Sequence, residues 1–238
     1  MKAAFIINDF KSMNLEKDTS IFLIKEAQKM DIATYAFDTS DILVKNGKVF
    51  VNSKKVVFKN STGYEHTLQK AVLSDLSSFS FIINRLNPPF NKEYLYLTNI
   101  LETYGIDSIN PPKALREINE KLAILNFPSF APETIVTANL NEIRKFVKVY
   151  KKAVLKPLDG MGGKSIFYLS EKDKNLNVIW ENVTKNGKSQ VMVQEYIEEA
   201  AQGDNRLIFI NYDLLPKKLI RIPSVEDFRG NLAVGAAS

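Results

Sequence analysis

The sequence of 238 residues contains no cysteine and a single histidine, His66. The absence of cysteine excludes disulfides, thiolate nucleophiles and thiolate-bound metals, and it fits a reducing compartment. We interpret the lone histidine as a structural or exposed residue, because no carboxylate pattern accompanies it. Any chemistry must therefore depend on carboxylates, lysines, arginines, backbone amides or a metal ion.

Long apolar runs are lacking as well. The amino terminus, KAAFIIND, reaches a polar residue after a short apolar stretch, and no run of about 18 apolar residues follows. The pattern predicts no signal peptide, no membrane span and a cytoplasmic protein. Hydrophobic residues make up 45% of the chain and charged residues 25%, a composition that is typical of globular proteins and predicts a substantial core.

The charge is only mildly unbalanced. Lysine and arginine number 32 against 27 acidic residues, a formal net charge of +5. The lysines are scattered and no basic stripe with interleaved aromatic residues is present, so we expect no nucleic-acid partner. A mildly basic surface or a weak attraction for anionic substrates would each account for the excess.

The first half of the chain alternates strand and helix patterns. Such alternation predicts an α/β fold with a mainly parallel sheet and helices on its faces. Asn46-Gly47 between two β-rich runs predicts a hairpin with a two-residue turn. Asp18 and Ser20 fit either a helix cap or a substrate contact. The expected strands are 2–8, 33–38, 79–84 and 107–110, and the expected helices are 19–30, 93–103 and 114–125.

The second half predicts an antiparallel sheet with two helices. Asn139, followed by Glu142, has the pattern of a helix start. The expected helices are 139–150 and 175–184, and the expected strands are 133–137, 153–157, 165–169 and 191–195. Two further strands, 207–210 and 218–222, are expected to flank a turn at NYDL.

The stretch KPLDGMGGKS, residues 156–165, ends like a phosphate-binding Walker loop. The spacing excludes that motif, because Leu158 stands where it requires glycine and a β-rich run, not a helix, follows the loop. The dinucleotide fingerprint fails too, since Ser165 takes the place of its third glycine. What remains is a glycine loop between two strands. It can donate backbone amides to a polyphosphate, or it can be an ordinary flexible hairpin.

The surroundings of this loop favour a nucleotide site. Lys156 closes the strand that precedes the loop, and Lys121 lies on a predicted helix. The run VQEYI ends a strand in a linker whose backbone can pair with the edge of an adenine, and Asp204 follows at a distance that suits a ribose. Together these features predict a nucleotide clamp.

Several stretches in a fixed order resemble the prokaryotic glutathione synthetase family of the ATP-grasp superfamily. The resemblance covers essentially the whole chain, and KPLDGMGG with the pair RIP and RGNLA is its most specific part. The stretches are KDTS at 17–20, RLNPPF at 85–90, NPPKALREINEKL at 110–122, APETIVT at 131–137, KPLDGMGGKSIF at 156–167, VQEYI at 193–197, GDNRLIFIN at 203–211 and RIPSVEDFRGNLAVG at 221–235.

The resemblance implies an α/β architecture in three parts. Residues 1–120 would form a pre-ATP-grasp domain with a parallel sheet on the substrate side. Residues 121–200 would form the small, lid-like ATP-grasp subdomain with an antiparallel sheet and helices. Residues 201–238 would begin the C-terminal ATP-grasp subdomain.

The resemblance also implies a reaction. The family joins γ-glutamylcysteine to glycine with ATP and Mg²⁺ through an acyl phosphate, and a homo-oligomer is a further implication. Two alternatives remain open: another ATP-grasp carboxylate–amine ligase, and a non-catalytic ATP-binding fragment.

The family's functional residues map onto this sequence as follows. The anion clamps for substrate carboxylates and the acyl phosphate, which we take as the catalytic residues, are Arg206, Arg221 and Arg229. The ATP-binding residues are Lys121 and Lys156 at the phosphates, Asp159, Gly160, Met161, Gly162 and Gly163 in the covering loop, Gln194, Glu195, Tyr196 and Ile197 around the adenine, and Asp204 at the ribose. For an arginine in a strand such as LIRIP, a surface ion pair is the alternative interpretation.

The family's magnesium ligands have no counterpart in this sequence. In the family they are acidic residues and an asparagine in a segment that follows the match to GNLAVG, and no Asp/Glu-x-Asn pair occurs here in a matching context. We therefore expect a shortened chain, with the metal ligands in a segment beyond residue 238.

Overall fold

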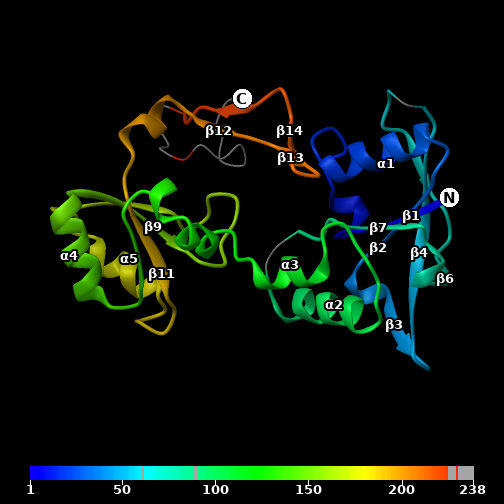
Figure 1. The fold of residues 1–238 in the computed structure, drawn as a ribbon, viewed down its shortest axis with the longest axis horizontal. Coiled ribbons are helices and arrows are strands. Elements are labelled where there is room, and N and C mark those ends of the chain that lie inside the picture. Colours follow the sequence, from blue (N-terminus) through cyan, green and yellow to red (C-terminus); the bar gives the residue numbers. More distant parts are fainter. Residues whose placement is uncertain (61, 88–89, 225–228, 230–238) are drawn as a thin grey trace. The chain divides into compact units, whose positions relative to one another are not determined.

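The structure, a computed structural model, describes residues 1–60, 62–87, 90–224 and 229. It divides into two compact units, the first being Met1–Ile118 and the second beginning at Asn119, and Figure 1 shows their elements. Parts of two stretches singled out in the sequence lie outside the described residues. They are the two prolines of RLNPPF, and residues 225–228 and 230–238 of the carboxyl-terminal stretch.

A seven-stranded sheet forms the centre of the first unit. Its main order is β3-β4-β2-β1-β7, and β5 and β6 also pair with β4. The strands are β1 (Lys2–Ile6), β2 (Ala33–Phe37), β3 (Ile42–Lys45), β4 (Lys48–Phe58), β5 (His66–Leu68), β6 (Val72–Asp75) and β7 (Phe81–Asn84).

The sheet is parallel at its centre and antiparallel towards one edge. Strand β1 runs parallel to β2 and β7, as the alternation of strands and helices predicts. Strand β4 runs antiparallel to β2 and β3, because the chain reverses within two residues at Asn46 (φ 50°) and Gly47 (φ 71°). The hairpin prediction is confirmed, and it explains why the whole sheet is mixed.

Both faces of this sheet are covered. Ala3 and Phe5 of β1 pack with Ile21 and Ile24 of α1 (Thr19–Lys29) on one side. The alternate residues of β1 pack on the other side with Leu97 and Leu101 of α2 (Lys92–Thr103). A strand buried on both faces is uniformly apolar, as the run AAFI is. Asp18 caps α1 by accepting a hydrogen bond from the Ser20 amide at 2.7 Å, so the cap interpretation is confirmed for Asp18.

Two predictions near the end of the first unit are wrong. The expected helix 114–125 is split into α3 (Pro112–Glu117) and a 3-10 helix, Leu122–Asn126. The side chain of Asn119 accepts hydrogen bonds from the backbone amides of Lys121 and Leu122, which starts a new turn instead of continuing the old one. The expected strand 107–110 is reduced to a single bridge between Ile83 and Ile109.

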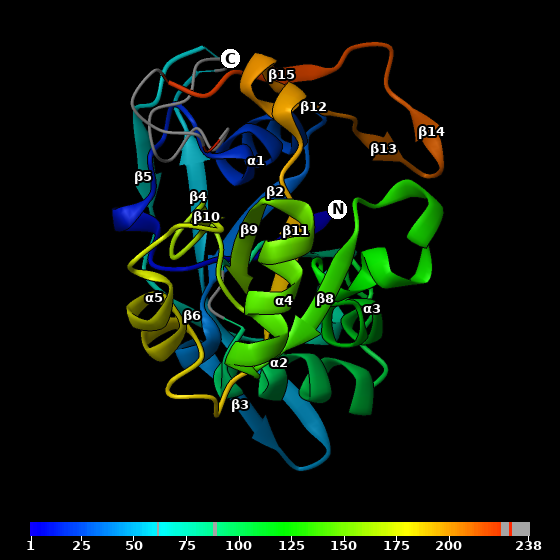
Figure 2. The same cartoon turned by 90° about the vertical axis from the view of Figure 1, so that its left-hand side faces the viewer.

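The second unit is built on a four-stranded antiparallel sheet of order β10-β9-β11-β8. Helices α4 (Leu140–Tyr150) and α5 (Leu176–Val183) lie against one of its faces, as Figure 2 shows. Asn139 caps α4, as its spacing to Glu142 predicts. The strands are β8 (Thr134–Thr137), β9 (Lys152–Pro157), β10 (Phe167–Ser170) and β11 (Val191–Glu195).

Two small ribbons follow this sheet. Strand β12 (Asp204–Arg206) pairs with β15 (Leu219–Arg221), and β13 (Phe209–Ile210) pairs with β14 (Asp213–Leu214). The two strands expected to flank NYDL therefore do not face each other, because Asn211 and Tyr212 take positive φ angles of 49° and 71° and reverse the chain at once. Among the described residues, no helix combines the length and apolarity needed to cross a membrane.

Candidate functional site

The glycine loop connects β9 to β10, two antiparallel neighbours in the sheet. A strand follows the loop, so the structure confirms that it is not a Walker loop. Gly162 and Gly163 have φ angles of 63° and 78°, a region that glycine enters without strain. At Gly160, a Cβ atom would lie 2.7 Å from the Pro157 ring. Three glycines are therefore needed for two reasons: backbone conformation at 162 and 163, and close packing at 160.

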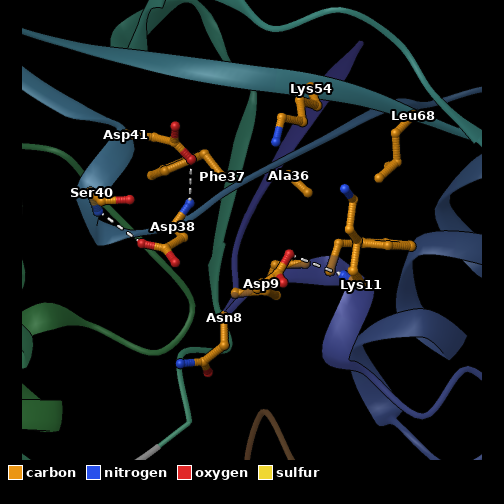
Figure 3. A pocket seen from close by; sticks show the side chains of 12 residues that line it. Asn8, Asp9, Lys11, Ala36, Phe37, Asp38, Ser40, Asp41, Lys54 and Leu68 are labelled. Carbon is orange, nitrogen blue, oxygen red and sulfur yellow. Dashed lines mark hydrogen bonds between the residues drawn. The ribbon is translucent and has the colours of Figure 1, made fainter.

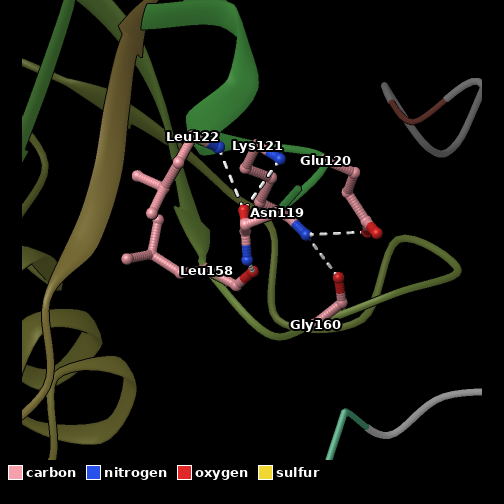
Figure 4. Close-up of polar contacts among 6 residues, drawn as sticks. All are labelled: Asn119, Glu120, Lys121, Leu122, Leu158 and Gly160. Carbon is pink, nitrogen blue, oxygen red and sulfur yellow. Dashed lines mark hydrogen bonds and ion pairs between the residues drawn. The ribbon is translucent and has the colours of Figure 1, made fainter. Parts of the chain in front are cut away.

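Side chains from outside the loop bond to its carbonyl groups. Lys121 Nζ donates to the Gly160 carbonyl at 2.5 Å, and Arg229 Nη1 donates to the Gly163 carbonyl at 2.6 Å. Figure 4 shows the Lys121 contact together with that of Asn119, whose amide donates to the Leu158 carbonyl at 3.0 Å. Lys121 and Arg229, which are far apart in the sequence, are thus both brought to the loop.

Lys156 lies in β9, the strand that leads into the loop, and belongs to a chain of hydrogen bonds that crosses the sheet. Its Nζ donates to Gln194 Oε1 at 2.6 Å, and the Gln194 amide donates to Thr134 Oγ1 at 3.0 Å. The Thr134 hydroxyl in turn donates to the Pro132 carbonyl at 2.7 Å. Gln194 is only 5% exposed, so its amide orientation is fixed by a donor on one side and an acceptor on the other.

The ammonium group of Lys156 is destabilised by its surroundings. Burial lowers the pKa of Lys156 from its usual 10.5, and the positive charge of Lys121 lowers it further. Two cations that repel each other at a glycine loop form a site that an anion stabilises.

A cavity of about 200 Å³ opens on the face of the sheet opposite α4 and α5. Val154 and Lys156 of β9 line it because alternate residues of a strand share a face. Its wall combines apolar side chains with a few polar groups, as small-molecule sites do. The lining residues are Pro132, Val154, Lys156, Ile166, Gln194, Glu195, Tyr196, Ile197, Ala200 and Arg229.

The segment after β11 forms one edge of this cavity. Its backbone is held by the Tyr196 amide, which donates to the Lys152 carbonyl at 3.2 Å. The Tyr196 ring meets Tyr168 edge-on, with ring centres 5.1 Å apart. Ile197 is 48% exposed, so apolar surface at this edge is available to a planar ring.

Asp204 and Arg221 are bonded to each other. Arg221 Nε and Nη2 donate to the two oxygens of Asp204 at 2.7 and 2.5 Å, across the β12–β15 pair. Arg206 lies two residues after Asp204 in β12, and its side chain is exposed. Neither strand contributes to the lining of the cavity, so the structure does not bring Asp204, Arg206 and Arg221 to the Lys156 side chain.

A second hollow of about 240 Å³ lies in the first unit, at the carboxyl ends of β1 and β2. Figure 3 shows Asp9, Asp38 and Asp41 with Lys11 and Lys54 around it. Local backbone amides hold each carboxylate: Asp9 accepts from Lys11, Asp38 from Ser40 and Asp41 from Asp38. None of the residues that the sequence nominates lines this hollow.

Within the described part of the chain, no group of three or more His, Cys, Asp or Glu side chains is placed to hold a metal ion. Mg²⁺ prefers several oxygen ligands, and the described residues do not bring such a set of ligands together. No magnesium ligand is therefore assigned.

Sequence reasoning misses two polar contributors to the site, Thr134 and Asn119. Thr134 sits in an ordinary strand pattern, and nothing in the sequence shows that its hydroxyl meets Gln194. The sequence nominates Gln194 itself, but not its hydrogen bonds to Lys156 and Thr134. Asn119 could have been found, because an asparagine two residues before Lys121 is a typical start of a turn.

Models of two protein families match this chain. Residues 1–116 match the prokaryotic glutathione synthetase N-terminal domain, and residues 120–238 match the prokaryotic glutathione synthetase ATP-grasp domain.

Similar proteins agree with these matches. The chain is 37% identical over 240 residues to a glutathione synthetase of Wigglesworthia glossinidia brevipalpis, and 35% identical over 240 residues to one of Shewanella oneidensis. Each alignment covers 100% of this chain and 76% of the relative. Among solved structures, D-alanyl-alanine synthetase A of Vibrio cholerae superposes with a TM-score of 0.57 at 12% identity, covering 94% of this chain and 68% of that one. At that identity the likeness concerns the fold alone.

Proposed function

The chain belongs to the prokaryotic glutathione synthetase family, and from this premise we propose that it is an ATP-dependent ligase that joins γ-glutamylcysteine to glycine. The observation that carries the proposal is the cavity beside the glycine loop, where Lys121, Lys156 and Arg229 meet loop carbonyls or the cavity wall. Three cations around glycine backbone form a site for a polyphosphate.

In this proposal the nucleotide would lie in the site in one direction. Its phosphates would lie at Lys121, Lys156 and the loop residues Asp159 to Gly163, where the positive charges of the two lysines meet the glycine backbone. Its adenine would lie against Val154, Ile166 and the segment Glu195–Ile197, which supply apolar surface and backbone groups. Gln194 would reach the nucleotide through Lys156, because its side-chain oxygen already accepts from that amine.

The reaction needs charge neutralisation more than a protein nucleophile. A carboxylate oxygen of γ-glutamylcysteine attacks the γ-phosphorus of ATP, the bond to the β-phosphate bridging oxygen breaks, and ADP leaves. The glycine amine then attacks the acyl carbon, the C–N bond forms, and phosphate departs as the amine loses a proton. Lysines and arginines stabilise the charge that builds up on the transferred phosphoryl group, so the absence of cysteine and the single histidine are no obstacle.

The roles of the remaining arginines follow from what they contact. Arg229 lines the cavity and holds the loop, which suits a clamp for the transferred phosphoryl group. Asp204 holds Arg221 through Nε and Nη2, and the guanidinium fixed in this way would suit a substrate carboxylate, with Asp204 orienting it or the ribose. The exposed guanidinium of Arg206 suits the same kind of anion.

Three further features belong to the proposal. The ATP-grasp lid would be residues 121–200, after a substrate-side domain of residues 1–120, with residues 201–238 starting another subdomain. A reaction whose substrate and product both carry a free thiol suits the reducing cytoplasm. Mg²⁺ and a homo-oligomer are carried over from the family resemblance alone.

The test is a product assay with isotope tracing. The full chain is incubated with MgATP, glycine and γ-glutamylcysteine labelled with ¹⁸O in its cysteinyl carboxylate. The proposal predicts glutathione and one ¹⁸O atom in the released phosphate. Product formed only with another amine would indicate a different ligase, and ATP binding without turnover would indicate a nucleotide-binding role.

A matched pair of variants serves as the control. Lys156→Met should abolish product, because it removes the half-buried cation of the phosphate site. Lys152→Met should retain it, because Lys152 lies on the same strand but is exposed and paired with Glu198.

A further inference from the structure

Three loop carbonyls are bonded to side chains that the loop does not contain. The Leu158 carbonyl accepts from Asn119 at 3.0 Å, that of Gly160 from Lys121 at 2.5 Å, and that of Gly163 from Arg229 at 2.6 Å. The donors therefore hold the loop at its entrance, its middle and its end.

These donors differ in charge. Lys121 and Arg229 are cations, and a phosphate oxygen adds ion-pair attraction that a neutral carbonyl does not offer them. A phosphate arriving at the loop therefore competes with the Gly160 and Gly163 carbonyls for them. The amide of Asn119 is neutral, so a phosphate has no comparable advantage over the Leu158 carbonyl.

Asn119 is also bonded in a second direction. Its Oδ1 accepts from the amides of Lys121 and Leu122 at 2.9 and 3.0 Å, while its Nδ2 faces Leu158, as Figure 4 shows. Rotating the amide by half a turn would oppose donors to donors and oxygen to oxygen, so its orientation is determined. A single half-buried side chain thus joins the turn that presents Lys121 to the strand end where the loop begins.

We infer that Asn119 is a positioning residue of the nucleotide site: it anchors the entrance of the glycine loop to the Lys121 turn whether or not nucleotide is bound. Lys121 and Arg229 exchange loop carbonyls for phosphate oxygens when nucleotide arrives, and the loop then depends on Asn119 alone among the three. This swap of hydrogen-bond partners rests on the proposed ATP binding, whereas the anchor in the nucleotide-free protein does not.

The experiment compares hydrogen exchange of backbone amides in residues 158–166 between variants of the full chain without nucleotide. Asn119→Asp keeps the oxygen that caps the turn but replaces the donor to Leu158 with an acceptor. Loss of this bond should speed loop exchange by roughly tenfold, with the midpoint of thermal unfolding close to that of the wild type. Asn126→Asp adds the same charge at an exposed side chain, at the end of the 3-10 helix that follows this turn, and it should leave loop exchange unchanged.

A third variant separates the anchor from the cap. Asn119→Ala removes both and should speed loop exchange and also lower the unfolding midpoint. If Asn119→Asp exchanged as slowly as the wild type while Asn119→Ala exchanged fast, the cap alone would hold the loop and the inference would be overturned. Equal acceleration in Asn119→Asp and Asn126→Asp would overturn it too.

Adding MgATP tests whether Lys121 and Arg229 swap loop carbonyls for phosphate oxygens. In the wild type it should slow loop exchange, and in Asn119→Asp this protection should be several-fold smaller, with a raised KM for ATP and little change in kcat. If ATP left the wild-type loop unchanged, the proposed ATP binding would fail while the nucleotide-free comparison still decided the anchor. Equal protection by MgATP in both proteins would overturn the anchor's role in the bound state.

Discussion

At the scale of single residues, the site depends on a lysine whose charge is costly. Lys156 lies in the sheet and donates to a buried glutamine, Gln194. The charged group that acts on the pKa of Lys156 is another cation, Lys121. The sequence identifies this lysine from its place before the glycine loop. It cannot show the burial that lowers the pKa, because burial depends on which strands meet.

The lowered pKa of Lys156 leads to a prediction about pH. Nucleotide phosphate favours the charged amine, so ATP affinity should fall as the pH rises through the lowered pKa towards the usual 10.5. Lys156→Arg stays protonated throughout this range, and its affinity should vary less. Calorimetric titration of ATP across this range measures both, and parallel curves for the two proteins would contradict the assignment.

The same pKa has a consequence for stability. The folded protein binds fewer protons at Lys156 than the unfolded chain does between the lowered pKa and 10.5. Stability from this group therefore rises with pH in that window, and below the lowered pKa the cost of the buried charge is present in full. Replacing Lys156 with Met should accordingly stabilise the folded protein near neutral pH while abolishing activity.

A second prediction at this scale concerns Thr134. Thr134→Val keeps the shape of the side chain but leaves the buried Gln194 amide without its acceptor, a loss of about 1–3 kcal/mol. Lys156 loses its fixed partner as a result, and the ATP dissociation constant should rise several-fold. Thr134→Ser retains the hydroxyl and is the control, so equal affinities for the two variants would show that the hydrogen-bond chain plays no part.

At the scale of elements, the glycine loop combines two requirements that the sequence shows only as composition. Positive φ angles at Gly162 and Gly163 are readable from glycine itself. The contact between Gly160 and the Pro157 ring is not, because it depends on how the strand end folds back on the loop.

Gly160→Ala tests the packing requirement. The added methyl group would lie 2.7 Å from Pro157, so the loop must shift and the Gly160 carbonyl must move away from Lys121. The expected result is an ATP dissociation constant raised roughly tenfold, the size of one lost charge-assisted contact. The control is Gly47→Ala in the β3–β4 turn, where strain should lower stability and leave ATP binding unchanged.

The elements themselves were largely predictable, for identifiable reasons. Strand β1, helix α4 and the Asn46-Gly47 turn follow from apolar runs, a cap and turn chemistry, all of which are local. The helix expected at 114–125 was wrong because Asn119 competes for the backbone amides of the next turn. The pairing of β12 with β15 was not foreseen, since partners 13 or more residues apart are not encoded in local pattern.

At the scale of the whole molecule, each unit has its own core. The clusters around β1 belong to the first unit, and the cluster of α4, α5 and their sheet belongs to the second. The only tryptophan of the chain, Trp180, lies in α5 and donates to the Ala138 carbonyl at 2.8 Å. Its fluorescence therefore reports on the second unit.

Separate cores predict separate responses to ligand. A ligand that binds the folded state of one unit stabilises that unit by mass action, so ATP should raise the midpoint of Trp180 unfolding. Amide exchange in β1 should change much less. An equal increase in both units would contradict the placement of the nucleotide in the second unit.

The central claim is that ATP binds in the cavity beside the glycine loop, and photolabelling tests it most directly. The full chain is irradiated with 8-azido-ATP, with and without excess ATP, and the labelled peptides are mapped by mass spectrometry. The account predicts ATP-protected label on peptides that contain Val154, Ile166 or residues 195–200. Protected label at the hollow between Asp9 and Asp38 of the first unit, with none at the glycine loop, would contradict it.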